Sequence, residues 1–595
     1  MKRRTLLRSV AMLPLLGLPM PVRATTRARR RVRPTDAAWP AAASWAKLRD
    51  AVGGNLLEVQ PLFGACRAEP ASAACHDALG NIGNPCWIGD QPAGTEVSGW
   101  LGAWTPAPSA CALRARHAAD VAAGVNFARD NNLRLVVKGG GHSYQGTSNA
   151  PDSLLIWTRA MSQVTLHDAF VGQGCEGRQA PVPAVSAEAG AVWIDVYNAV
   201  TTEGGRYVQG GSCATVGVAG LIQSGGFNSF SKGFGMVAAG LLEAEIVTAD
   251  GKVRVANACS EPDLYWAIKG GGGGTFGVVT RVTLHTHDLP EFFGYTGGTI
   301  KAQSDGAFAR LVARFIGFYH EKLFNPHWGE HVHFGPDNTL EIGMVSQGLD
   351  NVQIEETWQA FFDWVRASPQ DFVVVSPLRA GAWDARHWWD LAGESWNRDT
   401  RADAPARRGW NKGDQGEVGV FLHGYDSLWL PATLLHENQR KRLVEALVAA
   451  SRHKMVRLHI GKGLAGAPPA VLAAARQTAI NPAALEAFTL VIIADGQGPN
   501  YPGLARPTMD LAAAAKDARA IDLASAELRR IAPYAGSYVS ESNYFNESWQ
   551  EDFWGRNYRR LRAIKKQYDP DGLFCVHHGV GSEEWSADGF TRLDR

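Results

Sequence analysis

The fold of this chain is decided by two short stretches of sequence: KGGGHSYQG, residues 138–146, and GGSCATVGVAG, residues 210–220. Each stretch places one nucleophilic side chain, His142 or Cys213, within a run of small residues. Small residues let the backbone come close to a flat, bulky ligand. Both stretches are therefore typical of loops that surround a bound cofactor.

The first glycine run follows a short apolar segment, LRLVV at residues 133–137, which predicts a buried strand. A glycine-rich turn after a strand exposes backbone N–H groups that can bind a pyrophosphate. We therefore expect Gly139, Gly140 and Gly141 to contact a phosphate-bearing cofactor.

A third run, Gly270–Gly274 followed by Gly277, formally contains the pattern G-x-G-x-x-G. The dinucleotide fingerprint of that form needs a strand before it and a helix after it. Here a helix-like stretch, DLYWAIK, comes before and a strand-like stretch, FGVVTRVTL, comes after. The reversed order argues against a Rossmann-type NAD site, and the sequence holds no G-x-x-x-x-G-K-[ST] phosphate loop.

The rest of the chain predicts a mixture of helices and strands. Residues 25 to about 110 are rich in Pro, Ala and turn residues, which predicts irregular structure with short helices. Glycine clusters thin out between about 290 and 530, where aromatic residues mix with helix-like and strand-like stretches. Further expected elements are helices at 118–131, 192–202 and 263–268 and strands at 242–248 and 278–285.

Together, these motifs resemble those of the berberine-bridge-enzyme-like oxidases, within the superfamily named after vanillyl-alcohol oxidase and p-cresol methylhydroxylase (PCMH). Further matches to that family are SGGFNSFSKGFGMVA (224–238), WAIKGGGGGTFGVVT (266–280) and FWGRNYRRLRAIKKQYDPDGLF (553–574). The segment HHGVGSEEW (577–585) resembles the isoamyl-alcohol-oxidase-like subgroup. The resemblance is strong over residues 80–290 and 530–590 and loose between them.

The resemblance implies an α+β fold. A PCMH-type FAD-binding domain of two subdomains would be built from N-terminal and C-terminal parts of the chain. A substrate domain, an antiparallel sheet with helices, would be inserted between them. The expected segments are an export signal (1–24), an N-terminal extension (25–105), the FAD-binding domain (106–288), the substrate domain (289–530) and a C-terminal segment that returns to the FAD domain (531–595).

The resemblance also implies a bicovalent FAD. His142 would bond the 8α-methyl carbon of the flavin ring, and Cys213 would bond ring carbon C6. Ala214 and Ala219 stand where the family usually has proline and glycine, and both departures are mild. The other positions expected to contact the cofactor are Gly139, Gly140, Gly141, Ser143, Val216, Gly217, Gly220, Gly225, Gly272, Gly277 and Val278.

Two tyrosines are candidates for the catalytic base. Tyr538, in SYVSESN, matches a substrate-side tyrosine of the family, although Ser540 replaces the usual asparagine; Tyr144 matches a second active-site tyrosine. A third family tyrosine is Phe227 in this chain. Tyrosine has a pKa near ~10 and needs a neighbour to serve as a base. Candidates to assist are Glu541 and Gln497.

The function that these expectations favour is oxidation of a CH–OH group in an alcohol or sugar hemiacetal. A flavin accepts the hydride, and the protein positions the substrate. Valine at the position of Val216 accompanies oxidases in the family, so we expect O2 to be the acceptor and H2O2 the product. The alternatives are an oxidative-cyclising biosynthetic flavoenzyme, a dehydrogenase with another acceptor, and a flavin- or carbohydrate-binding protein without turnover.

The N-terminus has the pattern of an export signal. Arg3 and Arg4 precede a short apolar stretch at residues 11–18, and the segment ends at Val22-Arg23-Ala24. The paired arginines favour the bacterial twin-arginine machinery and a periplasmic or secreted protein; the alternatives are a Sec signal and an ordinary basic N-terminal tail. The apolar stretch is too short to span a bilayer, so no membrane association is expected after signal removal.

Composition and cysteine and histidine spacing bear on which binding partners, disulfides and metal sites to expect. The chain has 595 residues, enough for two or three domains, and its net charge of +1 gives no support for nucleic acid or an anionic membrane as a partner. Four of its eight cysteines, Cys66, Cys75, Cys86 and Cys111, cluster before the first loop and can pair in several ways. The histidine pairs at 331/333 and 577/578 lack carboxylate or Cys partners at ligand spacing, so no metal site is predicted.

Overall fold

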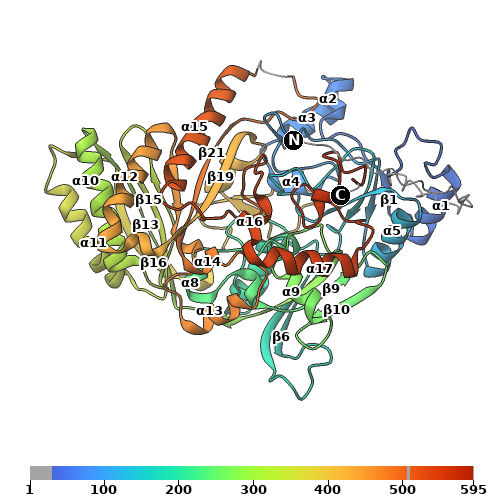
Figure 1. Ribbon diagram of the computed structural model, residues 1–595, viewed down its shortest axis with the longest axis horizontal. Helices are drawn as coiled ribbons and strands as arrows, with labels where there is room; N and C mark the ends of the chain where they lie inside the picture. The colour runs from blue at the N-terminus through green and yellow to red at the C-terminus, as the bar shows by residue number, and fades with distance from the viewer. Residues whose placement is uncertain (1–29, 506–508, 594–595) are drawn as a thin grey trace, which may run out of the picture.

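The computed structural model describes residues 30–505 and 509–593 (Figure 1). The expected export signal, residues 1–24, lies outside the described residues. The α+β class is confirmed, because helices alternate with sheets of four, five and eight strands. Within the described ranges, no helix combines the length and apolar character needed to cross a membrane.

The four-stranded sheet carries the first glycine loop. Its order is β1 (Leu56–Glu58), β3 (Cys111–Arg114), β5 (Ser153–Trp157) and β4 (Arg134–Lys138). Helix α5 (Ala118–Asp130) lies so close to this sheet that a Cβ at Gly124 would stand 2.5 Å from Ile156 Cδ1. The helix predicted at 118–131 and the strand predicted at 133–137 are thus confirmed. Strand β4 ends where the Gly139–Gly141 turn begins.

The five-stranded antiparallel sheet forms the other half of this unit. Its order is β10 (Val253–Asn257), β9 (Leu241–Val247), β11 (Val278–His285), β7 (Val182–Glu188) and β6 (Val164–Phe170). The predicted strands at 242–248 and 278–285 and the helix at 263–268 are confirmed by β9, β11 and α9 (Pro262–Ile268). The helix expected at 192–202 forms as α6 (Trp193–Tyr197) and then widens into a π-helix (Asn198–Glu203).

The C-terminal region packs against these sheets. Helix α17 (Tyr558–Tyr568) lies beside α9, where Arg560 stacks 4.1 Å over the Trp266 ring (Figure 1). A backbone bridge joins Phe574 to Leu135 of β4. The end of the chain therefore returns to the part that carries the first glycine loop.

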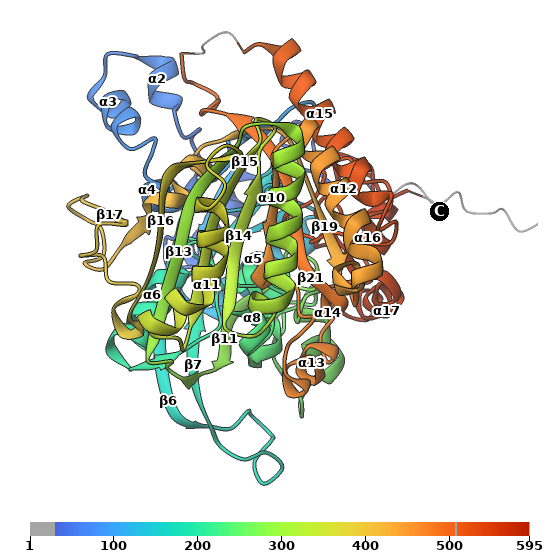
Figure 2. The same ribbon diagram turned by 90° about the vertical axis from the view of Figure 1, so that its left-hand side faces the viewer.

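The eight-stranded sheet forms a separate layer. Its order is β16 (Phe372–Asp384), β13 (Phe292–Ala302), β15 (Thr339–Gln347), β14 (Trp328–Phe334), β20 (Val456–His459), β21 (Ala487–Gln497), β19 (Phe421–Pro431) and β2 (Gly99–Trp100). One face is covered by helices α10 (Asp305–Phe318), α11 (Asn351–Arg366), α12 (Glu437–His453) and α15 (Leu511–Arg529), as Figure 2 shows for α10 and α11. Apolar side chains fill the interface between these helices and the sheet. Any binding site on this sheet is therefore expected on its opposite face.

The N-terminal stretch, residues 30–105, contributes strands both to the four-stranded sheet and to the eight-stranded sheet. It contains four short helices, as expected, and a Cys66–Cys75 disulfide. It also contains two strands that were not predicted: β1 pairs with β3, and β2 pairs with β19 of the eight-stranded sheet. Residues 95–98 consequently lie between the two layers.

Candidate functional site

The two loops identified in the sequence are in direct backbone contact. A Cβ on Gly140 would lie 2.8 Å from the backbone nitrogen of Gly217, and a Cβ on Gly217 would lie 2.9 Å from that of Gly140. A side chain at either position would therefore push the loops apart. Beside this contact, His142 Nε2 lies 3.0 Å from Thr215 Oγ1. The structure thus brings the segments of His142 and Cys213 together.

Backbone hydrogen bonds hold the second loop in place. Trp193 N donates to Val216 O, Ile194 N donates to Ala214 O, and Val218 N donates to Ala191 O, at 2.9–3.1 Å. Helix α7 (Val218–Gln223) then begins directly after Gly217. Cys213, two residues before Thr215, is a free thiol, so no disulfide occupies its sulfur.

Both nucleophilic side chains, His142 and Cys213, are uncharged near neutral pH. Burial lowers the pKa of His142 to about 4, and Glu96 Oε2 lies 3.8 Å from its Nε2. Burial, together with Glu417 and Asp414, raises the pKa of Glu96 to about 8. Burial and the same two neighbours raise the pKa of the Cys213 thiol well above its usual value. A neutral imidazole keeps a free electron pair and can act as a nucleophile.

Tyr144 faces a carboxylate that the motifs did not reveal. Its hydroxyl donates to Glu417 Oε2 at 3.1 Å, and its ring packs 5.1 Å from the Tyr425 ring. Burial and the nearby Glu541 raise the pKa of Tyr425 well above its usual value. Glu417 lies at the end of a short 3-10 helix (Lys412–Glu417) that also carries Asp414, whose charge helps to raise the pKa of the Cys213 thiol.

Tyr538 has a different environment. Its ring is 5% exposed and packs 4.5 Å from the Phe227 ring. Its hydroxyl has no well-aligned hydrogen-bond partner among the described residues, and burial raises its pKa. Gln497 does not join either tyrosine, because its Oε1 lies 3.1 Å from His423 Nε2. Of the two candidates for a base, only Tyr144 therefore has a partner that can take a proton.

Sequence reasoning missed three acidic residues: Glu96, Asp414 and Glu417. Glu96 lies between the layers because Glu96 N donates to Gly141 O and Gly419 N donates to Glu96 O. The turn before it is held by Lys138, whose buried ammonium donates to the carbonyls of residues 91, 92 and 94. No local motif marks these residues, because the groups that they contact lie more than 40 positions away along the chain: Glu96 bonds Gly141, and Glu417 bonds Tyr144.

A cluster of ion pairs secures the segment that carries Asp414 and Glu417. Asp90 accepts from Arg159 and Arg401, each at 2.7 Å. Arg408 pairs with Asp195 at 2.9 Å. These bonds fasten the strand pair β17 (Trp396–Arg398) and β18 (Gly409–Asn411) to the N-terminal stretch and to the part of the chain that carries the glycine loops. The segment that follows β18 is thereby fixed over the loops.

The remaining positions expected to contact cofactor fall into two groups. A Cβ at Gly220 would meet no atom within 4 Å, so this residue borders open space, and Ser143 hydrogen-bonds Thr147 in the first loop. Gly277 and Val278 instead lie inside the five-stranded sheet, where a Cβ at Gly277 would stand 2.5 Å from Val247 O. Positive backbone φ angles and close packing explain the glycines at 225 and 272.

The histidine pair at 331/333 has carboxylate neighbours that its spacing did not reveal. His331 Nδ1 lies 3.4 Å from Glu330, and His333 Nδ1 lies 3.3 Å from Glu341. Within residues 30–505 and 509–593, no group of three or more His, Cys, Asp or Glu side chains has the arrangement of a metal site.

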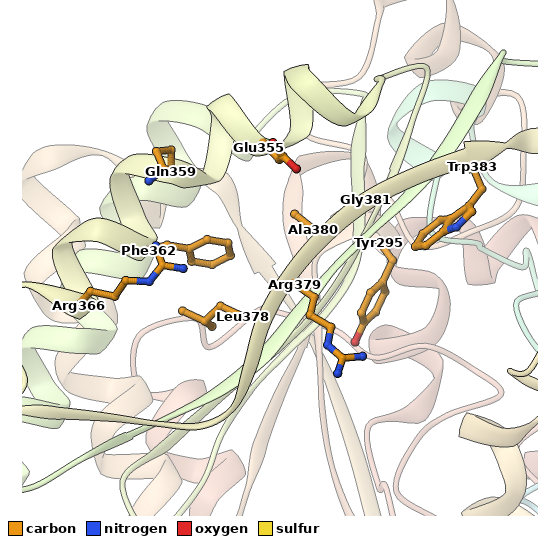
Figure 3. Close-up of a pocket in the computed structure, with 10 residues that line it drawn as sticks. All are labelled: Tyr295, Glu355, Gln359, Phe362, Arg366, Leu378, Arg379, Ala380, Gly381 and Trp383. Atoms are coloured by element: carbon orange, nitrogen blue, oxygen red, sulfur yellow. The ribbon is translucent and has the colours of Figure 1, made fainter.

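A separate groove lies at the edge of the eight-stranded sheet (Figure 3). It has a cavity volume of about 590 Å³ and lies between α11 and the edge strand β16. Its walls include the exposed rings of Tyr295 and Trp383 together with Glu355 and Arg379. β13, which carries Tyr295, is five strands away from β19, or about 24 Å at the usual strand spacing. This groove is therefore distinct from the site around the two loops.

Comparison with known proteins identifies two regions of the chain. A family model described as FAD binding domain matches residues 109–257, and a model described as berberine and berberine like matches residues 521–581. The VAO-type flavoprotein oxidase VAO615 of Thermothelomyces thermophilus is 27% identical, with 95% of each chain covered. The FAD-linked oxidoreductase malF of Malbranchea aurantiaca is 28% identical, covering 95% of this chain and 94% of its own.

Solved structures agree with these matches. The VAO-type flavoprotein MtVAO615 of Myceliophthora thermophila C1 superposes with a TM-score of 0.77 at 25% identity, covering 95% of this chain and all of its own. Glucooligosaccharide oxidase of Acremonium strictum has the same fold, with a TM-score of 0.60 at 17% identity and coverage of 82% and 94%. That oxidase is described with a 6-S-cysteinyl, 8α-N1-histidyl FAD.

The contact between Gly140 and Gly217 is testable by adding one methyl group. We expect Gly140→Ala to lower the free energy of unfolding by about 1–3 kcal/mol, the usual cost of overpacking. The matched control is Gly80→Ala in helix α3 (Ala73–Gly80), where a Cβ meets no atom within 4 Å. Urea unfolding of both variants measures the difference, and equal stability would show that the loops do not touch at Gly140.

Proposed function

We propose a function for this chain from its membership of the berberine-bridge-enzyme-like group of VAO-type, FAD-linked oxidoreductases. In our proposal it is an oxidase that holds FAD through two covalent bonds, at His142 and Cys213. The observation that carries the proposal is the backbone contact between Gly140 and Gly217, which brings together the two segments that carry these nucleophiles. The bicovalent flavin described for glucooligosaccharide oxidase supports it.

The residues around the loops fit this cofactor. The Gly139–Gly141 turn offers backbone N–H groups to a pyrophosphate, and Gly220 borders open space. Burial lowers the pKa of His142 to about 4, which keeps its imidazole neutral near pH 7, and Asp414 lies near enough to the Cys213 thiol to raise its pKa. Bound here, FAD would supply a hydride acceptor for the substrate carbon.

Covalent attachment can be tested without a substrate. After denaturation and acid precipitation, flavin fluorescence should stay with the wild-type polypeptide. It should also stay with His142→Ala and with Cys213→Ala, because each keeps one bond, and it should be lost only from the double variant. Flavin released from the wild type would contradict both anchors, while protein without any flavin would contradict the cofactor itself.

We further propose that Tyr144 and Glu417 together take the proton of the substrate hydroxyl. Burial and the charge of Glu417 raise the pKa of Tyr144 well above its usual value, so the tyrosine does not hold a negative charge alone. Its hydroxyl instead passes its proton to Glu417 Oε2 while it accepts one from the substrate. In the balanced reaction the carbinol loses one hydride and one proton to become a carbonyl, and O2 gains both to become H2O2. Val216 beside Cys213 supports O2 as the acceptor.

This assignment separates the two candidate tyrosines. Tyr144→Phe and Glu417→Gln should each lower kcat by about 10²–10⁴-fold, the usual contribution of a general base. Tyr538→Phe should lower it less than about tenfold, because its hydroxyl has no proton acceptor. H2O2 formed per flavin, with benzylic alcohols and reducing sugars as substrates, measures the effect. Loss confined to Tyr538→Phe would reverse the assignment, and turnover only with a dye would indicate a dehydrogenase.

We also propose that the chain is exported by the twin-arginine route. The disulfides Cys66–Cys75 and Cys175–Cys259 support an oxidising destination. Replacing Arg3 and Arg4 by Lys in a bacterial host should leave the protein in the cytoplasm, whereas the unaltered chain should be exported and begin near Thr25 by intact mass. Export that survives the double replacement would contradict this route.

A further inference from the structure

The His142 ring is held by the loop that carries the other nucleophile. His142 Nε2 lies 3.0 Å from Thr215 Oγ1, and Glu96 Oε2 stands 3.8 Å from the same nitrogen. No hydrogen-bond partner of His142 Nδ1 lies within residues 30–505 and 509–593, and 18% of the side chain is exposed. Nδ1 is therefore the ring nitrogen that remains open to a ligand.

Thr215 is itself held in place. Its side chain is buried, and the backbone on either side of it is bonded to the first residues of helix α6, where Ala214 O and Val216 O accept hydrogen bonds at 2.9 and 3.1 Å. Because Thr215 is fixed, its contact with Nε2 sets the orientation of the His142 ring.

A second side chain, Glu330 of strand β14, contacts the residue just before Cys213. Ser212 Oγ donates to Glu330 Oε1 at 3.2 Å, and Ser229 Oγ donates to the same oxygen. The other carboxylate oxygen lies 3.4 Å from Nδ1 of His331. The eight-stranded sheet therefore reaches the Cys213 loop through one carboxylate.

The backbone of Glu330 has an unusual conformation. Its φ angle is 64°, in the left-handed region that residues other than glycine seldom adopt. Next to it, a Cβ on Gly329 would lie 1.7 Å from Ser229 O, so the strand and the segment of Ser229 are in direct contact. Strained residues of this kind cluster at functional sites. The strain lies within a strand, where no turn or helix end requires it, and it coincides with the side chain that reaches the Cys213 loop.

We propose that Thr215 and Glu330 are positioning residues for the two attachments, Thr215 for the histidyl bond and Glu330 for the cysteinyl bond. The inference rests on the proposed function and adds two residues that do not themselves bond the flavin. The Nε2–H group of His142 donates to Thr215 Oγ1, which leaves the free electron pair on Nδ1. Glu330 holds Ser212, and with it the adjoining Cys213, in place while the second bond forms.

Both attachments follow the same balance of atoms and electrons. At His142 a C–H bond of the 8α-methyl group breaks, a bond from Nδ1 to that carbon forms, and the imidazole proton leaves from Nε2. At Cys213 the S–H bond and the C–H bond at C6 break, and an S–C bond forms. Each time two electrons and two protons pass to O2, the acceptor of the proposed function, which becomes H2O2. An imidazole that already carries its proton on Nε2 offers Nδ1 as the nucleophile without rearrangement.

The role of Thr215 can be tested with only one attachment present. Full-length Cys213→Ala protein, prepared flavin-free from riboflavin-starved cells and mixed with FAD in air, should form the histidyl bond alone. Thr215→Val in that background should slow the bond about tenfold, as expected for one lost hydrogen bond, and Thr215→Ser should restore the rate. The readout is the flavin fluorescence that stays with the acid-precipitated polypeptide over time.

The matching test uses His142→Ala, which leaves only the cysteinyl bond. Glu330→Met removes both acceptor oxygens and should slow that bond about tenfold, whereas Glu330→Gln keeps one oxygen for the serines and should slow it less. The two sets of variants control each other. Thr215→Val should leave the cysteinyl rate nearly unchanged, because the partner of its hydroxyl is already absent from His142→Ala, and Glu330→Met should leave the histidyl rate nearly unchanged.

The outcomes separate this inference from the proposed function. Unchanged rates for Thr215→Val in Cys213→Ala and for Glu330→Met in His142→Ala, in protein that still bonds FAD, overturn the positioning roles alone. Equal slowing of both attachments by either variant indicates a general loss of structure and also overturns those roles. Wild-type protein that forms no covalent bond to FAD overturns the proposed function, and the positioning roles with it.

Discussion

The contact between Gly140 and Gly217 is the constraint on which the rest of the site depends. Two loops, separated by about seventy positions, approach until backbone meets backbone, and neither accepts a Cβ at the point of contact. The contact therefore fixes the positions of the residues on either side of it in both loops. Beside the contact, His142 Nε2 of one loop lies 3.0 Å from Thr215 Oγ1 of the other. Chemistry that requires two fixed attachment points needs such a rigid frame.

Segments outside the two glycine loops supply the carboxyl groups that surround them. They carry nucleophiles but no carboxylate, and the acids arrive from the N-terminal stretch and from the segment after β18. Both segments are held by buried polar groups: the ammonium of Lys138 fixes the turn before Glu96, and Asp90 joins Arg159 to Arg401. Removing one partner from such a cluster leaves a buried charge unpaired. Ion pairs and hydrogen bonds therefore join the part of the chain that carries the glycine loops to the two segments that carry the acids.

Sequence patterns predicted the features of this protein that depend on residues close together in the sequence. The strand before Gly139, the helix that precedes it and the strand at β11 follow from apolar runs bounded by turn residues, and the glycine loops are recognisable because backbone contact demands glycine at fixed spacing. Glu96 and Glu417 could not be predicted in this way. Their roles arise from burial and from neighbours far away along the chain, and an isolated Glu in a turn looks like any solvated Glu. Tyr538 illustrates the converse, since its motif is local but its hydroxyl is left without a well-aligned partner.

The pairing of residues 95–98 with 418–420 has a consequence for how such proteins diversify. Ser98 N donates to Val420 O and Gly419 N donates to Glu96 O, so two segments from distant parts of the chain are stitched into one cover. The glycine loops beneath it contribute none of these bonds except the one from Glu96 N to Gly141 O. We therefore expect these two segments to tolerate replacement only when both are replaced together. Replacing one segment alone would break the backbone hydrogen bonds between them, so the residues of one segment limit the substitutions that the other can accept.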